Sequence, residues 1–313
     1  MFASYSFLVS VYNESAQYLD LAIRSMLSQS TRPQKIVIVN DGSDKRETLQ
    51  VLDSFKNHPK ICIINQQNIG LTKSLNIGAS RIESRWIARH DSDDWSEHPR
   101  IELQLKEISD KKLELCGTQA KIVTENGKYI SQTKLPNDST SIRKKILSGN
   151  PFCHGSLVFS SDVFQKLGGY PEIFSCSQDY ALFSKMSLQF KCGNLKSALY
   201  NLRKKLSSVS IRYNVEQIVM NIVIQEYLMN PTVEISRENV ENRITQLENC
   251  DHMRLLGQIK LMNNNLLARK EYKHIRKVIP LIIKYPNNIK LITNLIRAHI
   301  YYLFPYISHK LFS

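Results

Sequence analysis

The chain has 313 residues, with 42 lysines and arginines against 28 aspartates and glutamates, so its formal net charge is +14. Hydrophobic residues make up 42% and charged residues 22%, a globular composition that excludes wholesale disorder. With only 11 glycines and 10 prolines, the chain is neither collagenous nor of low complexity. The length allows one large domain or two modest ones.

The cysteines and the N-terminus indicate a reducing compartment. Six cysteines occur without a Cys-x-x-Cys pair, at positions 62, 116, 153, 176, 192 and 250. This spacing argues against a zinc knuckle or a disulfide framework and favours reduced thiols. The first residues, MFASYSFLVSVYNES, lack the basic and long apolar segments of a signal peptide. No run of about 18 apolar residues occurs, so we expect no membrane span.

The first 115 residues alternate between short apolar runs and helix-like patterns. Four runs are typical of strands buried on both faces: residues 7–12, 35–40, 60–65 and 85–89. Apolar residues at helical spacing follow each run, at 18–27, 49–55, 71–78 and, after Pro99, at 101–108. Strand–helix–strand repetition predicts a parallel, right-handed α/β sheet.

Polar residues follow every predicted strand. They are YNE at 12–14, NDGS at 40–43, QNIG at 67–70 and HDSDD at 90–94. In parallel sheets, ligands bind at the carboxyl ends of the strands. These four segments are therefore the candidate ligand site.

Three carboxylates, those of Asp91, Asp93 and Asp94, stand within four residues. Carboxylates this close repel, so one takes up a proton unless a cation lies among them. Oxygen ligands suit Mg²⁺ or Mn²⁺, which commonly bind substrate phosphates. The segment predicts a metal-bridged phosphate, and the alternative is a solvated acidic turn that caps the next helix. Asp41 likewise has two interpretations: ordinary turn chemistry, or a carboxylate that accepts a base N–H such as uracil N3.

At this point four ordered motifs resemble family 2 glycosyltransferases with the GT-A fold. They are VSVYNES, IVNDGS, QQNIGLTKSLNIG and WIARHDSDDWSEHPRIELQ, and the resemblance covers about residues 5–205. It implies a Rossmann-like nucleotide-sugar-binding domain over residues 1–205, with an acceptor-binding half.

The resemblance implies a donor site at the strand ends. It assigns nucleotide-sugar binding to Tyr12, Glu14, Asp41, Asn68, Lys73, Asp91, Ser92 and Asp93. Asp93 would be the direct ligand of Mn²⁺ or Mg²⁺, and Asp91 would complete the metal site nearer the ribose and sugar. Asp94 matches the frequent third acid of the family.

The second half of the family pattern matches less closely. It covers FCHGS at 152–156, GGY at 168–170 and QD at 178–179, where the family usually has Glu-Asp. The resemblance implies that Asp179 is the catalytic base. His154 would contact the acceptor or the diphosphate, with a buried structural histidine as the alternative. Arg203, in the weaker match YNLR, would do the same.

The family implies transfer with inversion at the anomeric carbon. The donor would be a UDP-sugar of the Glc, Gal or GlcNAc type, and the acceptor a hydroxyl of a saccharide linked to undecaprenyl diphosphate. The pathway would be bacterial O-antigen or capsule synthesis. The particular sugar is not readable, because epimers differ in a few hydrogen bonds.

The C-terminal region, residues 206–313, is predicted to be a helical, basic extension. Residues 255–313 hold ten lysines and arginines and one acid, Glu271. Apolar positions between 292 and 303 form a one-sided helical stripe, which packs on the catalytic domain or lies on an anionic membrane. We expect a cytoplasmic protein, peripheral on the inner face of the bacterial inner membrane. No nucleic-acid motif accompanies the charge, so no nucleic acid is expected.

Three functions are alternatives to a glycosyltransferase. A phosphohydrolase would use Asp91 as nucleophile, but Asp94 stands where such enzymes need a small β-branched residue. A nucleotidyltransferase would need a Gly-rich, Lys-containing loop near the first strand. A non-catalytic membrane scaffold with a decayed transferase fold would not need the acids at 41, 91, 93 and 179.

Overall fold

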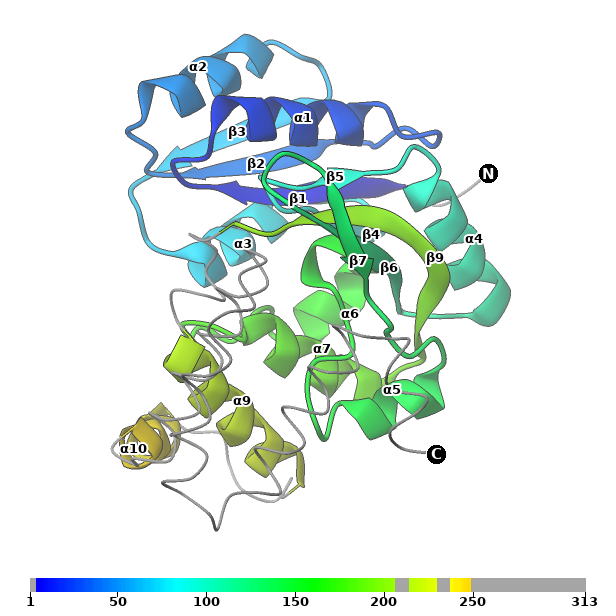
Figure 1. Ribbon diagram of the computed structural model, residues 1–313, viewed down its shortest axis with the longest axis vertical. Coiled ribbons are helices and arrows are strands. Elements are labelled where there is room, and N and C mark those ends of the chain that lie inside the picture. The colour runs from blue at the N-terminus through cyan, green and yellow to red at the C-terminus, as the bar shows by residue number, and fades with distance from the viewer. Residues whose placement is uncertain (1–3, 206–213, 230–236, 249–313) are drawn as a thin grey trace, which may run out of the picture. The chain divides into compact units, whose positions relative to one another are not determined.

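A computed structural model describes residues 4–205, 214–229 and 237–248 of the chain (Figure 1). These ranges all fall within one compact unit, Met1–Gly257. The apolar stripe at 292–303 and the basic stretch at 255–313 lie outside the described residues. The division of the chain at residue 205 stays a prediction.

The four predicted strands form the parallel half of the sheet. They are β1 (Tyr5–Val11), β2 (Ile36–Asp41), β3 (Ile61–Gln66) and β4 (Trp86–Arg89), with β2 and β4 on either side of β1. One boundary differs in a way that affects the site. Asp41 was expected after the second strand, but it pairs with Gln66 and is therefore the last residue of β2.

The second half of the sheet is mixed in direction. The order is β3-β2-β1-β4-β8-β6-β9-β5, with β7 paired to β6. These additional strands are β5 (Trp95–Ser96), β6 (Leu115–Val123), β7 (Tyr129–Gln132), β8 (Val158–Ser160) and β9 (Cys192–Arg203). Strand β9 runs parallel to β6 and antiparallel to β5, where Trp95 pairs with Asn201. This pairing brings the end of β9 beside the acidic segment at 90–94.

Two hydrophobic cores cover the two faces of the sheet. Because side chains alternate along a strand, Phe7 and Val9 of β1 join one core and Leu8 joins the other. The first core takes α1 (Ala16–Leu27), α2 (Arg46–Phe55) and α4 (Arg100–Lys111). Figure 1 shows α1 and α2 on one side of β1–β3 and α3 (Leu71–Ala79) on the other.

The second core holds most of the remaining helices. They are α5 (Ser139–Lys145), α6 (Ser161–Lys166), α7 (Gln178–Gln189), α9 (Asn214–Met229) and α10 (Arg237–Glu248), with a 3₁₀ turn at His154–Ser156. Among the described residues, no helix has both the length and the apolar character needed to cross a bilayer. Cys62, Cys116, Cys153 and Cys192 are free thiols.

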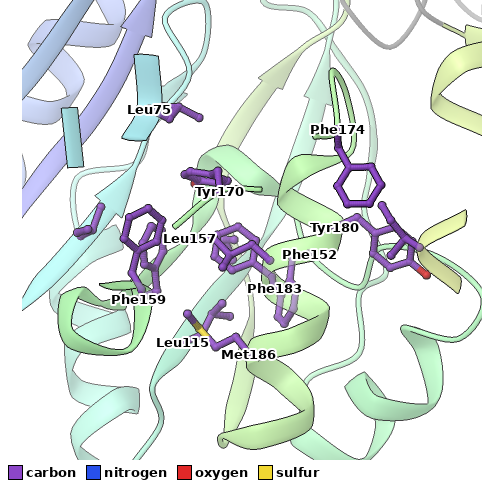
Figure 2. Packing of buried hydrophobic residues seen from close by; sticks show 14 of the residues in the cluster. Leu75, Leu115, Phe152, Leu157, Phe159, Tyr170, Phe174, Tyr180, Phe183 and Met186 are labelled. Carbon is purple, nitrogen blue, oxygen red and sulfur yellow. The ribbon is translucent and has the colours of Figure 1, made fainter. Parts of the chain in front are cut away.

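An aromatic cluster in the second core fixes helix α7 (Figure 2). Phe183 of α7 packs with Phe152, Phe159 and Tyr170, with ring centroids 6.3, 5.2 and 6.0 Å away. Edge and tilted ring contacts of this kind add to the stabilisation that burial provides. The cluster therefore holds the first turn of α7, which carries Asp179, against the segment at 152–156.

Gly42 allows the turns after β2 and β3 to pack together. Its φ is +75°, and a Cβ built there would lie 2.5 Å from the backbone nitrogen of Asn68. A side chain at this position would meet both an unfavourable backbone conformation and a fixed backbone atom. The NDGS and QNIG segments therefore depend on a glycine for their contact.

We predict that Gly42→Ala lowers the free energy of unfolding by about 2–4 kcal/mol, because left-handed strain and overpacking add. Urea denaturation measures this loss. The matched control is Gly127→Ala, since Gly127 has a φ of +77° but its Cβ would lie 3.7 Å from Trp95, an ordinary contact. That control should lose about 1–2 kcal/mol, the strain alone. Equal losses in the two variants would contradict the close approach.

Candidate functional site

The loops after β1 and β2 are tied to each other by Asn13. Its side chain donates to Asp44 Oδ1 at 2.7 Å and accepts from the backbone N–H groups of Asp44 and Lys45 at 2.9 and 3.0 Å. Its own N–H donates to Ser43 Oγ at 3.0 Å. Tyr12, just before it, is 55% exposed. The segment from Tyr12 to Glu14 is thereby held beside the NDGS turn.

Asp41 anchors the turn that leads into α3. Its buried carboxylate accepts hydrogen bonds from Gln66 Nε2 at 2.9 Å and from the backbone N–H groups of Ile69 and Gly70 at 2.9 and 3.0 Å. Asn68 is exposed, and its side-chain amide donates to the carbonyl of Asp41 at 3.0 Å. These contacts give Asp41 a positioning role. Lys73 lies exposed on the first turn of α3.

Asp91 is held by a buried arginine. Arg89 Nη2 donates to Asp91 Oδ1 at 2.7 Å, and Arg89 Nη1 donates to the carbonyl of Leu8 at 3.3 Å. The Arg89 side chain is 1% exposed and that of Asp91 is 30% exposed. The backbone N–H of Asp91 donates to Tyr200 Oη at 3.0 Å. Asp91 therefore has a fixed, buried counter-charge in Arg89. Ser92, the next residue, is half-buried.

Asp93 is paired with Lys205, which the sequence analysis did not identify. Lys205 Nζ lies 2.7 Å from Asp93 Oδ2 and 2.8 Å from Glu14 Oε2. Burial lowers the pKa of Lys205, but Asp93 and Glu14 raise it more, so the pKa lies above its usual value. The ammonium therefore joins the acidic segment to the loop after β1. The only sequence signal for it is its place two residues after Arg203.

Asp94 is the buried member of the acidic run. Its Oδ1 accepts the backbone N–H of Arg203 at 2.7 Å. Burial raises the pKa of Asp94 well above its usual value, and the charges of Asp93 and Asp91 add to the rise. This direction agrees with the expectation that one of three adjacent carboxylates favours its protonated form.

Arg203 packs inside the protein. Its guanidinium carbon lies 4.0 Å from the ring centre of Tyr18 and 4.9 Å from that of Trp95. Its Nε donates to the carbonyl of Asp93 at 2.9 Å, and its Nη1 donates to the carbonyl of Glu125. These are the contacts of a residue that positions the Asp93 turn. Contact of Arg203 with an acceptor or a diphosphate stays a prediction.

Two buried basic residues, Arg100 and His90, form hydrogen bonds next to or within the acidic segment. The buried Arg100 donates to the carbonyls of Arg89 and Gly155 at 2.9 and 3.2 Å, and burial lowers its pKa to about 10. Burial, with help from Arg100, lowers the pKa of His90 well below its usual value. The neutral His90 therefore donates from Nδ1 to the carbonyl of Asp91 at 2.7 Å.

The 3₁₀ turn with His154 lies directly against Asp91. A Cβ at Gly155 would lie 2.5 Å from Asp91 Oδ2, so only glycine fits here. His154 Nε2 lies 2.8 Å from Tyr170 Oη. Burial lowers the pKa of His154 to about 3, with Arg89 acting in the same direction and Asp179 opposing. His154 is therefore neutral at physiological pH.

Asp179 stands in the first turn of α7. Its Oδ2 accepts a hydrogen bond from Asn150 Nδ2 at 2.7 Å. Burial raises the pKa of Tyr170, Arg89 lowers it, and the charges of Asp179 and Asp91 both raise it. Phe183 of the same helix lies 6.0 Å from the His154 ring, centroid to centroid, and the adjoining Gly155 lies against Asp91. The structure brings Asp179 and the acidic segment to one region, which sequence spacing alone did not require.

The acidic segment fits a divalent cation in ligand type. Asp91 and Asp93 supply half-exposed oxygen donors, which Mg²⁺ and Mn²⁺ prefer. Among the described residues, no group of three or more metal-ligating side chains is assembled. Two carboxylates suit a cation whose other ligands are water and substrate phosphates. The region thus combines oxygen donors for such a cation with a separate carboxylate, Asp179, able to accept a proton.

Comparison with known proteins places the chain in a family. The family model described as Glycosyl transferase family 2 matches residues 6–168, more than half of the chain. The O-antigen biosynthesis glycosyltransferase WbnJ of Escherichia coli is 32% identical over 191 residues, which are 60% of this chain and 74% of WbnJ. The amylovoran biosynthesis glycosyltransferase AmsE of Erwinia amylovora is 30% identical over 212 residues, 66% of this chain and 79% of AmsE.

More distant matches include a longer protein and a solved structure of similar fold. The chondroitin synthase of Pasteurella multocida is 26% identical over 293 residues, 90% of this chain but 29% of that longer protein. The crystal structure of S. aureus TarS 1–349 in complex with UDP superposes with a TM-score of 0.56 at 18% identity, covering 79% of this chain and 71% of TarS. The chain belongs to glycosyl transferase family 2 and is a glycosyltransferase with the GT-A fold.

Proposed function

We propose that the protein transfers a sugar from a UDP-sugar to a saccharide hydroxyl, with inversion at the anomeric carbon. The supporting observation is that the turn His154–Ser156 packs against Asp91 at Gly155 and against Phe183 of α7, the helix whose first turn carries Asp179. Donor and acceptor chemistry need this arrangement, since the sugar must leave a diphosphate on one side while a hydroxyl attacks from the other.

The donor is a UDP-sugar of the Glc, Gal or GlcNAc type. Structures of the similarly folded TarS include complexes with UDP and with UDP-GlcNAc. Tyr12, Glu14 and Asp41 hold the nucleoside, and Asn68 and Lys73 lie near the base or phosphates. The exposed Tyr12 ring offers an apolar face for a base, and Asp41 keeps the two adjoining turns in register.

A divalent cation, Mn²⁺ or Mg²⁺, binds at the acidic segment. Asp93 is its direct ligand, and Asp91 completes the site next to the ribose and sugar, with Ser92 between them. When bound, such a cation supplies neutralisation of the charge that grows on the departing diphosphate. Asp94, which is buried and accepts the backbone N–H of Arg203, is left out of this proposed metal site.

Asp179 is the catalytic base. The acceptor oxygen forms a bond to the anomeric carbon as its proton passes to the Asp179 carboxylate, and the bond from that carbon to the UDP oxygen breaks. The hydrogen bond from Asn150 orients Asp179 for this proton transfer. His154, neutral, contacts the acceptor or the diphosphate, and Arg203 holds the Asp93 turn or reaches the same ligand.

The acceptor is a saccharide carried on undecaprenyl diphosphate in bacterial polysaccharide synthesis. The relatives named for O-antigen and amylovoran biosynthesis support this pathway class. The basic residues at 255–313 support attraction to an anionic surface, on the inner face of the inner membrane. The family assignment removes support from the phosphohydrolase alternative.

A donor screen tests the whole proposal. UDP release is measured from a panel of UDP-sugars, with Mn²⁺ and then with a chelator. We expect one UDP-sugar to be hydrolysed slowly without acceptor, and only in the presence of the cation. Release from no UDP-sugar would refute the donor assignment, and release that persists with the chelator would refute the cation site.

Asp179→Asn tests the base. We expect kcat to fall by about 10²–10⁴, because the amide cannot accept the proton, while UDP affinity stays within about twofold. Asparagine keeps an oxygen that can accept from Asn150. The control is Asp162→Asn, which changes a carboxylate in the first turn of α6 and should leave kcat unchanged. Near-normal turnover of Asp179→Asn would show that another group is the base.

Asp93→Ala tests the cation. We expect the Mn²⁺-dependent part of UDP binding to disappear. Calorimetry should then give the variant the same UDP affinity with Mn²⁺ as with chelator, on the order of tenfold or more weaker than that of the native protein. Asp53→Ala, which removes an exposed carboxylate paired with Lys56, is the control. Persistence of the Mn²⁺ effect in Asp93→Ala would move the metal away from this segment.

Vesicle flotation tests the membrane surface. The full chain should float with vesicles containing anionic lipid and stay behind with purely zwitterionic ones, and salt should weaken the binding. Absence of flotation at low salt would count against the peripheral location, without bearing on the sugar transfer.

A further inference from the structure

Lys205 stands where two carboxylates from distant parts of the chain meet. Its Nζ lies 2.7 Å from Asp93 Oδ2 and 2.8 Å from Glu14 Oε2. The Tyr18 ring centre lies 5.4 Å from the same nitrogen. The side chains of Lys205, Glu14 and Asp93 are 14%, 13% and 22% exposed. Because water is partly excluded, this pairing is stronger than an exposed surface ion pair.

Simultaneous binding of the Lys205 ammonium and a divalent cation to Asp93 is electrostatically unfavourable. Both are positive, and the pair would repel at hydrogen-bond distance. A cation ligated by Asp93 Oδ2 must therefore displace the oxygen's present partner, Lys205. The same residue that the proposed function makes a metal ligand already carries a counter-charge from the protein itself.

We propose that Lys205 is an exchangeable internal cation that occupies Asp93 while the donor site is empty and competes with the divalent metal for it. This inference rests on the proposed function, because it takes Asp93 as the metal ligand. When the donor binds, its diphosphate offers the ammonium another acceptor, so that metal entry and donor binding favour each other. Two ligands that each release the same internal contact bind cooperatively.

The neighbouring Arg89–Asp91 pair differs in the property that exchange requires. Arg89 is 1% exposed and also donates to the carbonyl of Leu8. Its guanidinium is thus fixed in the protein interior. Lys205 carries a compact ammonium on a flexible four-carbon stem and is more exposed. Lys205 can turn toward a new acceptor, whereas Arg89 stays as the permanent counter-charge of Asp91.

The test measures Mn²⁺ binding by electron paramagnetic resonance, without any donor or turnover. Lys205→Met keeps an unbranched side chain, one atom shorter, and removes the competing charge, so Mn²⁺ should bind about tenfold more tightly than to the native protein. Lys205→Arg keeps the charge and should stay within about threefold. The control is Lys121→Met, which removes one lysine paired with Glu97 elsewhere and should leave Mn²⁺ affinity unchanged.

A second measurement repeats the titration with saturating UDP. UDP should tighten Mn²⁺ binding at least tenfold more in the native protein than in Lys205→Met, since only the native protein has a contact to release. Circular dichroism and thermal melting establish that each variant is folded. Equal or weaker Mn²⁺ binding by folded Lys205→Met would overturn the exchange. Failure of every protein to bind Mn²⁺, even with UDP, would instead overturn the metal site on which the inference rests.

Discussion

Like-charge repulsion within the acidic segment is the constraint on which the site depends. Three carboxylates in four residues cannot all remain ionised side by side without compensation. The protein handles each one differently: Asp91 is paired with Arg89, Asp93 is paired with Lys205, and Asp94 is buried with its pKa raised. The acidic segment is therefore compensated by the protein itself, and it keeps two partly exposed carboxylates for the proposed cation.

The mixed half of the sheet makes this compensation possible. Strand β9 pairs with β5 and brings Tyr200, Arg203 and Lys205 beside the segment. Beneath it, Arg100 connects the end of β4 with the 3₁₀ turn that carries His154. A site built on strands and supported by buried hydrogen bonds keeps its geometry better than one built on loops alone. In the proposed exchange at Asp93, the Lys205 side chain moves while the strands keep their positions.

The region around Asp179 depends on apolar packing to keep its geometry. Asp179 lies on a helix and not at the end of a strand. Its position depends on α7, whose Phe183 packs in an aromatic cluster. A hydrogen bond from Asn150 orients the Asp179 carboxylate. Under the proposed mechanism, a change in this core would alter proton transfer without touching the substrate, because it would shift the first turn of α7.

Local periodicity was enough to identify the four parallel strands and the helices between them, since burial on both faces and helical spacing are properties of neighbouring residues. The order of the motifs was enough for the family, which the comparisons confirm. The sequence also contained the physical problem of three adjacent acids. It could not place Asp41 in β2, because strand ends depend on the partner strand.

The amino-acid sequence by itself determined the parallel half of the sheet, the order of its polar ends and the excess of acid at 91–94. Only the tertiary structure decided which groups compensate that acid. Lys205 lies 191 residues from Glu14 along the chain, and Asn150 lies 29 residues from Asp179. Such pairs arise from how strands and helices are stacked, and no spacing rule along the chain encodes them, because long-range contacts are set by packing of the whole core.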